Sequence, residues 1–199
     1  MGSPRPAGPA DLSDRAARDL RYIRDTMARA GAFTALSGWG FVAVGAGAIA
    51  TGALAIANPD PIARARLWLI DAAVSVAVGL GATLFKAHRS GQSLRTGPFR
   101  KFVLGFGPAV AAGAVLTLAM LRDDHAAYLP TSWLLLYGVG LIGGGAYSVA
   151  VVPLMGGGFL ALGAIAAVAP AAWGEPLMIA GFGGAHLLFG ALIARSHGG

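Results

Sequence analysis

Residues 33–57 read FTALSGWGFVAVGAGAIATGALAIA and contain no charged side chain. A helix of about 20 residues crosses the roughly 30 Å of hydrocarbon in a bilayer, at about 1.5 Å per residue. An apolar run of this length therefore predicts a membrane-spanning helix. It is too long for the apolar core of a signal peptide, which has about 7–15 residues, so we do not expect a cleaved signal here.

Similar apolar stretches fill the rest of the chain. Hydrophobic residues make up 56% of the 199 positions and charged residues only 12%, against about 25% charged in soluble domains. We therefore predict an all-α, polytopic transmembrane bundle of six spans over residues 33–199. Around Pro153 a tight turn and a broken helix would leave the same pattern. The predicted spans are 33–57, 66–86, 102–121, 131–151, 154–173 and 176–194.

The first 32 residues differ from the rest. Residues 1–10, rich in Pro, Gly and Ala, predict a disordered tail. Residues 11–32 predict an amphipathic helix, because apolar positions recur at helical spacing and form one stripe. We expect this helix to lie on the cytoplasmic membrane surface; a solvated extension of the first span is the alternative. The stripe consists of Ala16, Leu20, Ile23, Met27 and Ala30.

Lysine and arginine fall unevenly between the loops. With the N-terminus inside, twelve of these cations lie on the inner side and three on the outer side. Cytoplasmic loops of membrane proteins carry such an excess, so we predict a cytoplasmic (inner) membrane protein with both termini inside. The tryptophans agree, because indole rings prefer the interface. Trp39 falls near the inner end of its span, and Trp68, Trp133 and Trp173 fall near outer ends.

The loop at 86–101 carries five cations and no acid. A negative cytoplasmic leaflet attracts such a segment by about 1 kcal/mol per cation near the surface. We therefore expect the loop to contact anionic lipid headgroups; a topology signal without lipid specificity is the alternative. The five candidate contacts are Lys86, Arg89, Arg95, Arg100 and Lys101.

Glycine occurs 31 times, mostly inside the spans. Small residues let helix backbones approach closely in a membrane, so we expect tight packing and no large cofactor. Two echoes hint at an inverted repeat. GFGPAV at 105–110 resembles GFGGAH at 181–186, and Gly-x-Gly at 38–40 resembles Gly-x-Gly at 138–140. Their offsets, 76 and 100, disagree, which argues against a simple duplication.

Two ionisable residues fall inside predicted spans, Asp71 in the second and His186 in the sixth. Such groups are expensive in hydrocarbon and by default mark a function or an internal partner. Their depths differ by only about 6–7 Å at 1.5 Å per residue, so they are a candidate intramembrane polar pair. The alternative is a hydrated Asp71 and a His186 bonded to a neighbouring helix.

Other motifs carry little chemistry. Gly138-x-Gly140-x-x-Gly143 spells a dinucleotide fingerprint but lies inside an apolar span, where helix packing explains it better. Asp123, Asp124 and His125 are neighbours on a short loop and predict no metal site. The absence of cysteine removes disulfides and thiolate ligands. The basic net charge fits a membrane topology signal, so we expect no nucleic-acid partner.

Several phrases also occur together in other chains. They are RYIRDTMARAGAFTALSGWG at 21–40, GPFRKFVLGFGPAVAAGAVLT at 97–117, WLLLYG at 133–138, VPLMG at 152–156 and GFGGAHLLFGALIAR at 181–195. In these phrases the chain resembles an uncharacterised family of small polytopic proteins of soil bacteria, whose genes often neighbour winged-helix regulators. The resemblance implies a bacterial inner-membrane protein and no activity.

The expected function is non-enzymatic, because no nucleophile–base set, phosphate loop or metal spacing occurs. We expect an interaction, sensory or accessory subunit, with a protein partner or a second copy of the chain beside the bilayer. The alternative is a small transporter or proton-coupled carrier that uses Asp71 and His186.

Overall fold

The computed structural model describes residues 15, 17–20, 22–23, 33–90 and 97–197. The chain divides into two units, residues 1–32 and 33–199. In the first unit the described residues are helical and exposed, including Leu20 and Ile23 of the predicted stripe. The predicted tail at 1–10 and most of the amphipathic helix at 11–32 lie outside the described residues.

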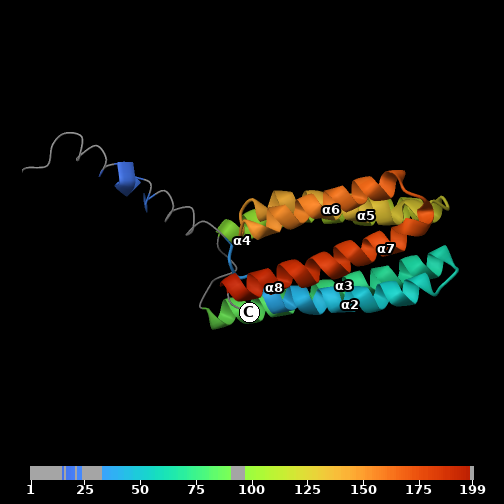
Figure 1. The fold of residues 1–199 in the computed structure, drawn as a ribbon, viewed down its shortest axis with the longest axis horizontal. Coiled ribbons are helices and arrows are strands. Elements are labelled where there is room, and N and C mark those ends of the chain that lie inside the picture. The colour runs from blue at the N-terminus through green and yellow to red at the C-terminus, as the bar shows by residue number, and fades with distance from the viewer. Residues whose placement is uncertain (1–14, 16, 21, 24–32, 91–96, 198–199) are drawn as a thin grey trace, which may run out of the picture. The chain divides into compact units, whose positions relative to one another are not determined.

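Over residues 33–90 and 97–197, six helices are long and apolar enough to cross a membrane, which confirms the predicted all-α bundle (Figure 1). The sixth is composite, because a π-helix interrupts it after a short 3-10 turn. The elements are α2 (Gly38–Ile56), α3 (Pro61–Arg89), α4 (Gly97–Arg122), η1 (Ala126–Tyr128), α5 (Leu129–Gly145), α6 (Val151–Val168), η2 (Ala171–Trp173), α7 (Gly174–Met178), the π-helix η3 (Ile179–Ala185) and α8 (His186–His197).

Local chemistry explains where the first helices begin. The Ser37 hydroxyl accepts a hydrogen bond from the Gly40 N–H at 3.1 Å and caps α2. The Asp60 carboxylate accepts from the N–H groups of Ile62 and Ala63 and caps α3. Pro61 follows at the first position of α3, where no N–H is required.

Two predicted boundaries were wrong. The fourth span ends at Gly145 rather than near 151, and a turn separates it from α6, so the region near Pro153 is a turn followed by a new helix. Pro153 lies in the first turn of α6, which tolerates a missing N–H. The fifth span ends at Val168 rather than at 173, because Pro170 cannot donate the N–H that would continue the helix. Pro108 lies inside α4.

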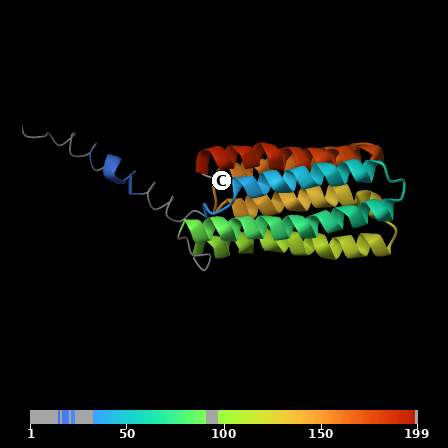
Figure 2. The ribbon, with the colours of Figure 1, turned by 90° about the horizontal axis from the view of Figure 1, so that it is seen from below.

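The helices form two groups of three, visible as two layers in Figure 1. In the α2 group, α2 packs against both α3 and α8 with its η3 segment; in the α5 group, α5 packs against both α4 and α6. Contacts of α6 with η3 and α8, and of α5 with α7, join the groups. Figure 2 shows α2 between α8 and α3 in the view turned by 90°.

Glycine sets the distance between helices within each group. A methyl group added at Gly105 would lie 2.5 Å from the carbonyl carbon of Gly143, and one at Gly138 would lie 2.9 Å from the Gly156 oxygen. Both distances are shorter than real methyl contacts, so only glycine permits the α4–α5 and α5–α6 approaches. In the α2 group, a methyl group at Gly190 would lie 2.8 Å from the Val42 nitrogen and 2.9 Å from the Gly38 oxygen of α2.

The two groups share one contact pattern. In each, a central helix, α2 or α5, packs against the two others, and Figure 1 shows that α2 and α5 run in opposite directions. The first sequence echo joins 105–110 in α4 with 181–186 in η3 and α8, and the second joins 38–40 in α2 with 138–140 in α5. An inverted repeat remains a prediction.

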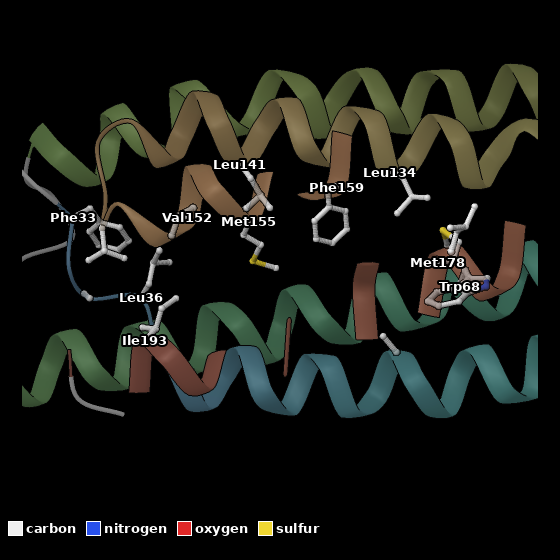
Figure 3. Packing of buried hydrophobic residues seen from close by; sticks show 14 of the residues in the cluster. Phe33, Leu36, Trp68, Leu134, Leu141, Val152, Met155, Phe159, Met178 and Ile193 are labelled. Carbon is white, nitrogen blue, oxygen red and sulfur yellow. The ribbon is translucent and has the colours of Figure 1, made fainter. Parts of the chain in front are cut away.

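Apolar side chains fill the space between the layers (Figure 3). Leu134 and Leu141 from α5 and Met155 and Phe159 from α6 are fully buried there. In lipid such packing stabilises the bundle through close contact rather than removal of apolar surface from water. We call the two ends of this interlayer core the Phe33 end and the Trp68 end, after residues labelled in Figure 3.

Candidate functional site between the two groups

His186 lies at the centre of the contact between the groups. It is the first residue of α8, follows the π-helix η3 directly, and is 3% exposed. Four aromatic rings surround the imidazole, with centroids 5.4–6.2 Å away. Phe41 comes from α2, Phe182 from η3, Tyr137 from α5 and Phe159 from α6. Both groups therefore contribute to the cage.

One hydrogen bond crosses between the groups here. Tyr137 Oη and His186 Nε2 are 2.8 Å apart. The other ring nitrogen, Nδ1, is buried and has no hydrogen-bond partner among the described residues. The backbone of Gly181 and Phe182 approaches the ring from the preceding turn without a regular hydrogen bond to Nδ1. Among the described residues, the buried imidazole therefore has one regular hydrogen bond, to Tyr137, and the tautomer decides which ring nitrogen carries the proton.

The π-helix η3 places His186 in this position. A π-helix carries one extra residue per turn, and such segments are frequent at functional sites. Its glycines fit η3 between neighbours on both sides. A methyl group at Gly181 would lie 2.7 Å from Leu134 Cδ2, and one at Gly183 would lie 2.6 Å from Ile49 Cγ1. Larger residues at either position would push η3 and His186 out of the aromatic cage.

Asp71 has a different partner. Its Oδ1 accepts a hydrogen bond from the Thr51 hydroxyl of α2 at 3.2 Å, and it lies beside Gly47 on the same helix. No hydrogen bond or ion pair joins Asp71 to His186 in the described part of the chain. The reason is geometric: α2 packs against both α3 and α8, so Asp71 meets α2 before it can reach α8.

Three of the five predicted lipid-binding cations have contacts within the protein. Lys86 Nζ donates to the Leu36 carbonyl at 3.0 Å. The Lys101 ammonium lies 5.5 Å from the Tyr147 ring centre, and the Arg89 guanidinium lies 5.1 Å from that of Phe85. Arg100 is exposed, and Arg95 lies outside the described residues. Lipid contact by this cluster remains a prediction.

The Trp68 end holds a second polar cluster, which the sequence did not reveal. Trp68 is 4% exposed, and its indole N–H donates to Glu175 Oε2 at 2.7 Å. Trp133 is partly buried, and its N–H donates to the Thr117 hydroxyl at 2.7 Å. Both indoles therefore face the protein interior, whereas Trp39 and Trp173 are exposed, as membrane-interface anchors would be.

The Phe33 end is closed by the segment before α2. The Phe33 N–H donates to the Tyr147 carbonyl at 2.7 Å, and the Ser148 hydroxyl donates to the Phe33 carbonyl at 2.7 Å. The Phe33 ring packs against Phe99 and Phe102 of α4. This segment thus ties the α2 group to the α5 group.

Comparisons with known proteins name no relative. No protein-family model, curated protein or solved structure matches the chain. Any proposal about function therefore rests on the described residues and their contacts.

Tyr137 is the site residue that the sequence analysis did not predict. The available signal was its phenol within an apolar span, since a buried tyrosine hydroxyl usually has a partner.

Proposed function

We propose that the protein is a small proton-coupled carrier of the bacterial cytoplasmic membrane, with both termini in the cytoplasm. The observation that carries the proposal is the His186–Tyr137 hydrogen bond between the two groups, with the second imidazole nitrogen unpaired. Carriers built from inverted halves bind substrate and coupling ions near the membrane midplane, where the halves meet and a helix is discontinuous. The groups, their contact and η3 fit that pattern.

The chemistry assigned to the site is proton exchange. Histidine is the side chain whose ordinary titration lies nearest neutral pH. If Nε2 accepts from Tyr137, Nδ1 already carries the proton; if Nε2 donates, Nδ1 is free to receive one. Protonation would place a charge in the contact between the groups and change the balance between their arrangements. Asp71, bonded within one group, has no part in this step.

The test is a pH jump applied to reconstituted protein on a solid-supported membrane. The parent protein should give a transient current as protons enter the site, and His186→Gln should abolish it. Tyr137→Phe should change the pH at which the current is half-maximal. The matched control is Asp71→Asn, which should keep the current. A current of equal size in His186→Gln, with the variant still folded by thermal melting, would contradict the proposal.

A second candidate is the interaction subunit expected from the sequence. It is favoured by α3, which packs mainly against α2 and exposes large apolar residues such as Ile70 and Phe85. Gly79 and Gly81 of α3 have open space where a side chain would lie. Small residues of this kind admit a partner helix in a membrane. Replacing both with leucine should release a co-purifying membrane partner if this reading is correct, and should leave the pH-jump current unchanged if it is not.

A further inference from the structure

A partly enclosed cavity of about 80 Å³ lies at the Trp68 end, between the two groups. The α2 group contributes residues of α3 and α7, and the α5 group contributes η1 and the start of α5. At about 10–15 Å³ per water position, the space holds roughly five to eight water-sized groups. Its principal lining residues are Arg64, Trp68, Leu129, Trp133, Glu175 and Met178.

One carboxylate dominates the polar chemistry of the cavity. The Glu175 side chain is 13% exposed, and the Trp68 indole N–H fixes its Oε2. Its Oε1 faces the Arg64 Nε at 3.9 Å, which is too long for a hydrogen bond. The Arg64 side chain is one-third exposed, so this contact is loose and screened by solvent. A different cation can therefore replace Arg64 beside Oε1.

The indole rings define the kind of cation. Trp68 and Trp133 both line the cavity, and hydrogen bonds hold both rings in place. A carboxylate next to fixed aromatic rings favours organic ammonium groups, because ring faces attract cations within about 6 Å. An anionic ligand would have to approach Glu175, the more buried of the two charged groups, and is disfavoured.

We propose that this cavity binds a small organic cation of alkylammonium size, with Glu175 as counter-ion and Trp68 and Trp133 as the aromatic walls. The Trp68 ring is 6.2 Å from that of Phe182, which stacks over His186. In the proposed carrier the cavity is therefore where substrate enters, but the binding step does not require proton coupling.

The test uses tryptophan fluorescence of the full chain in lipid nanodiscs. Trp39→Phe and Trp173→Phe remove the two exposed indoles, so that the signal reports Trp68 and Trp133. Tetramethylammonium and methylammonium should each give a saturable change, whereas sodium at equal ionic strength and neutral tert-butanol should not. Glu175→Gln, which keeps an acceptor for Trp68, should weaken binding at least tenfold. Arg64→Gln should strengthen it severalfold by removing the competing cation.

The matched control is Asp123→Asn, which removes an exposed carboxylate of the loop after α4 and should leave the affinity unchanged. Equal affinity in Glu175→Gln, equal binding of tert-butanol, or no saturable response would each overturn the proposal. His186→Gln separates this proposal from the proposed function, because it should abolish the pH-jump current while the fluorescence response persists. If the parent protein gave the pH-jump current but no fluorescence response to tetramethylammonium or methylammonium, only the cavity assignment would be overturned.

Discussion

The two ends of the interlayer core are held by different kinds of contact. At the Phe33 end, the Phe33 N–H donates to the Tyr147 carbonyl, the Phe33 carbonyl accepts from the Ser148 hydroxyl, and the buried Phe33 ring packs on α4, so that both groups are joined. At the Trp68 end, the groups leave a cavity, and side chains such as Trp68 and Glu175 line it. The cavity leaves the Trp68 end less closely packed than the Phe33 end, where backbone and ring contacts join the groups directly.

Carriers built from inverted halves rock the halves against each other around a fixed central site. In the proposed carrier, we expect the groups to pivot about the Phe33 end and to separate or close at the Trp68 end. His186 lies between the two ends, where a small rotation would change its distance from Tyr137.

The largest expected effect is at Phe33. Phe33→Ala should lower the free energy of unfolding by about 3–5 kcal/mol, because the ring is 4% exposed and packs on two others. Denaturant unfolding in detergent micelles measures this change. Leu84→Ala, a 55% exposed residue of α3, is the control and should change stability by less than about 0.5 kcal/mol. Equal values for both variants would show that Phe33 does not close its end.

Two glycines of α2 compare the ends directly. A methyl group at Gly38 would meet backbone, with the Gly190 oxygen at 2.6 Å, whereas one at Gly52 would meet the Ile179 side chain. Both substitutions should destabilise, Gly38→Ala by about 1–3 kcal/mol, and Gly52→Ala by somewhat less, because the Ile179 side chain can shift although its Cγ1 lies close to its own backbone. The same unfolding measurement ranks them. A larger loss for Gly52→Ala would reverse the assignment of the rigid end.

Ser148 gives a smaller effect at the Phe33 end. Ser148→Ala removes one hydrogen bond to the Phe33 carbonyl and should cost about 0.5–1.5 kcal/mol. Ser196→Ala, at an exposed position near the end of α8, is the control and should be neutral. If the two variants melt alike, the ring of Phe33 rather than its backbone closes this end.

The smallest expected effect is at Gly107, and it tests whether glycine stabilises the bundle through close helix packing. Gly107 of α4 has no atom within 4 Å of where a side chain would lie, although Gly105 two residues earlier touches Gly143. Gly107→Ala should leave stability unchanged or raise it by up to about 1 kcal/mol, since alanine favours a helix. Gly105→Ala should destabilise. Parallel losses in both variants would mean that glycine acts through something other than close packing.

The sequence predicted the number of membrane-spanning helices correctly, but it did not predict which residues of different helices meet. Helix number followed from apolar runs and their length, which are local properties. The break between α5 and α6 was misplaced because Gly145 and Val151 are both compatible with a helix, and contacts of Phe33 with Tyr147 and Ser148 mark the turn. Trp68 was expected at the membrane surface, but its depth did not reveal that the ring faces Glu175.

The candidate pair shows the same limit. Sequence position placed Asp71 and His186 at similar depths, because rise per residue is constant along a helix. Depth does not specify rotation about the helix axis or the order of helices around the bundle. The packing of α2 between α3 and α8 determines both properties. It places Asp71 within hydrogen-bond distance of Thr51, while His186 lies within hydrogen-bond distance of Tyr137.

By itself the sequence determined that the chain forms apolar helices of membrane length and that a histidine lies within one of them, since hydropathy and spacing act residue by residue. Only the tertiary structure decided that the helices form two groups of three, each around a central helix. It also decided that His186 meets Tyr137 across the contact between them. These features depend on which glycines permit close approach, and that depends on the partner helix as much as on the glycine.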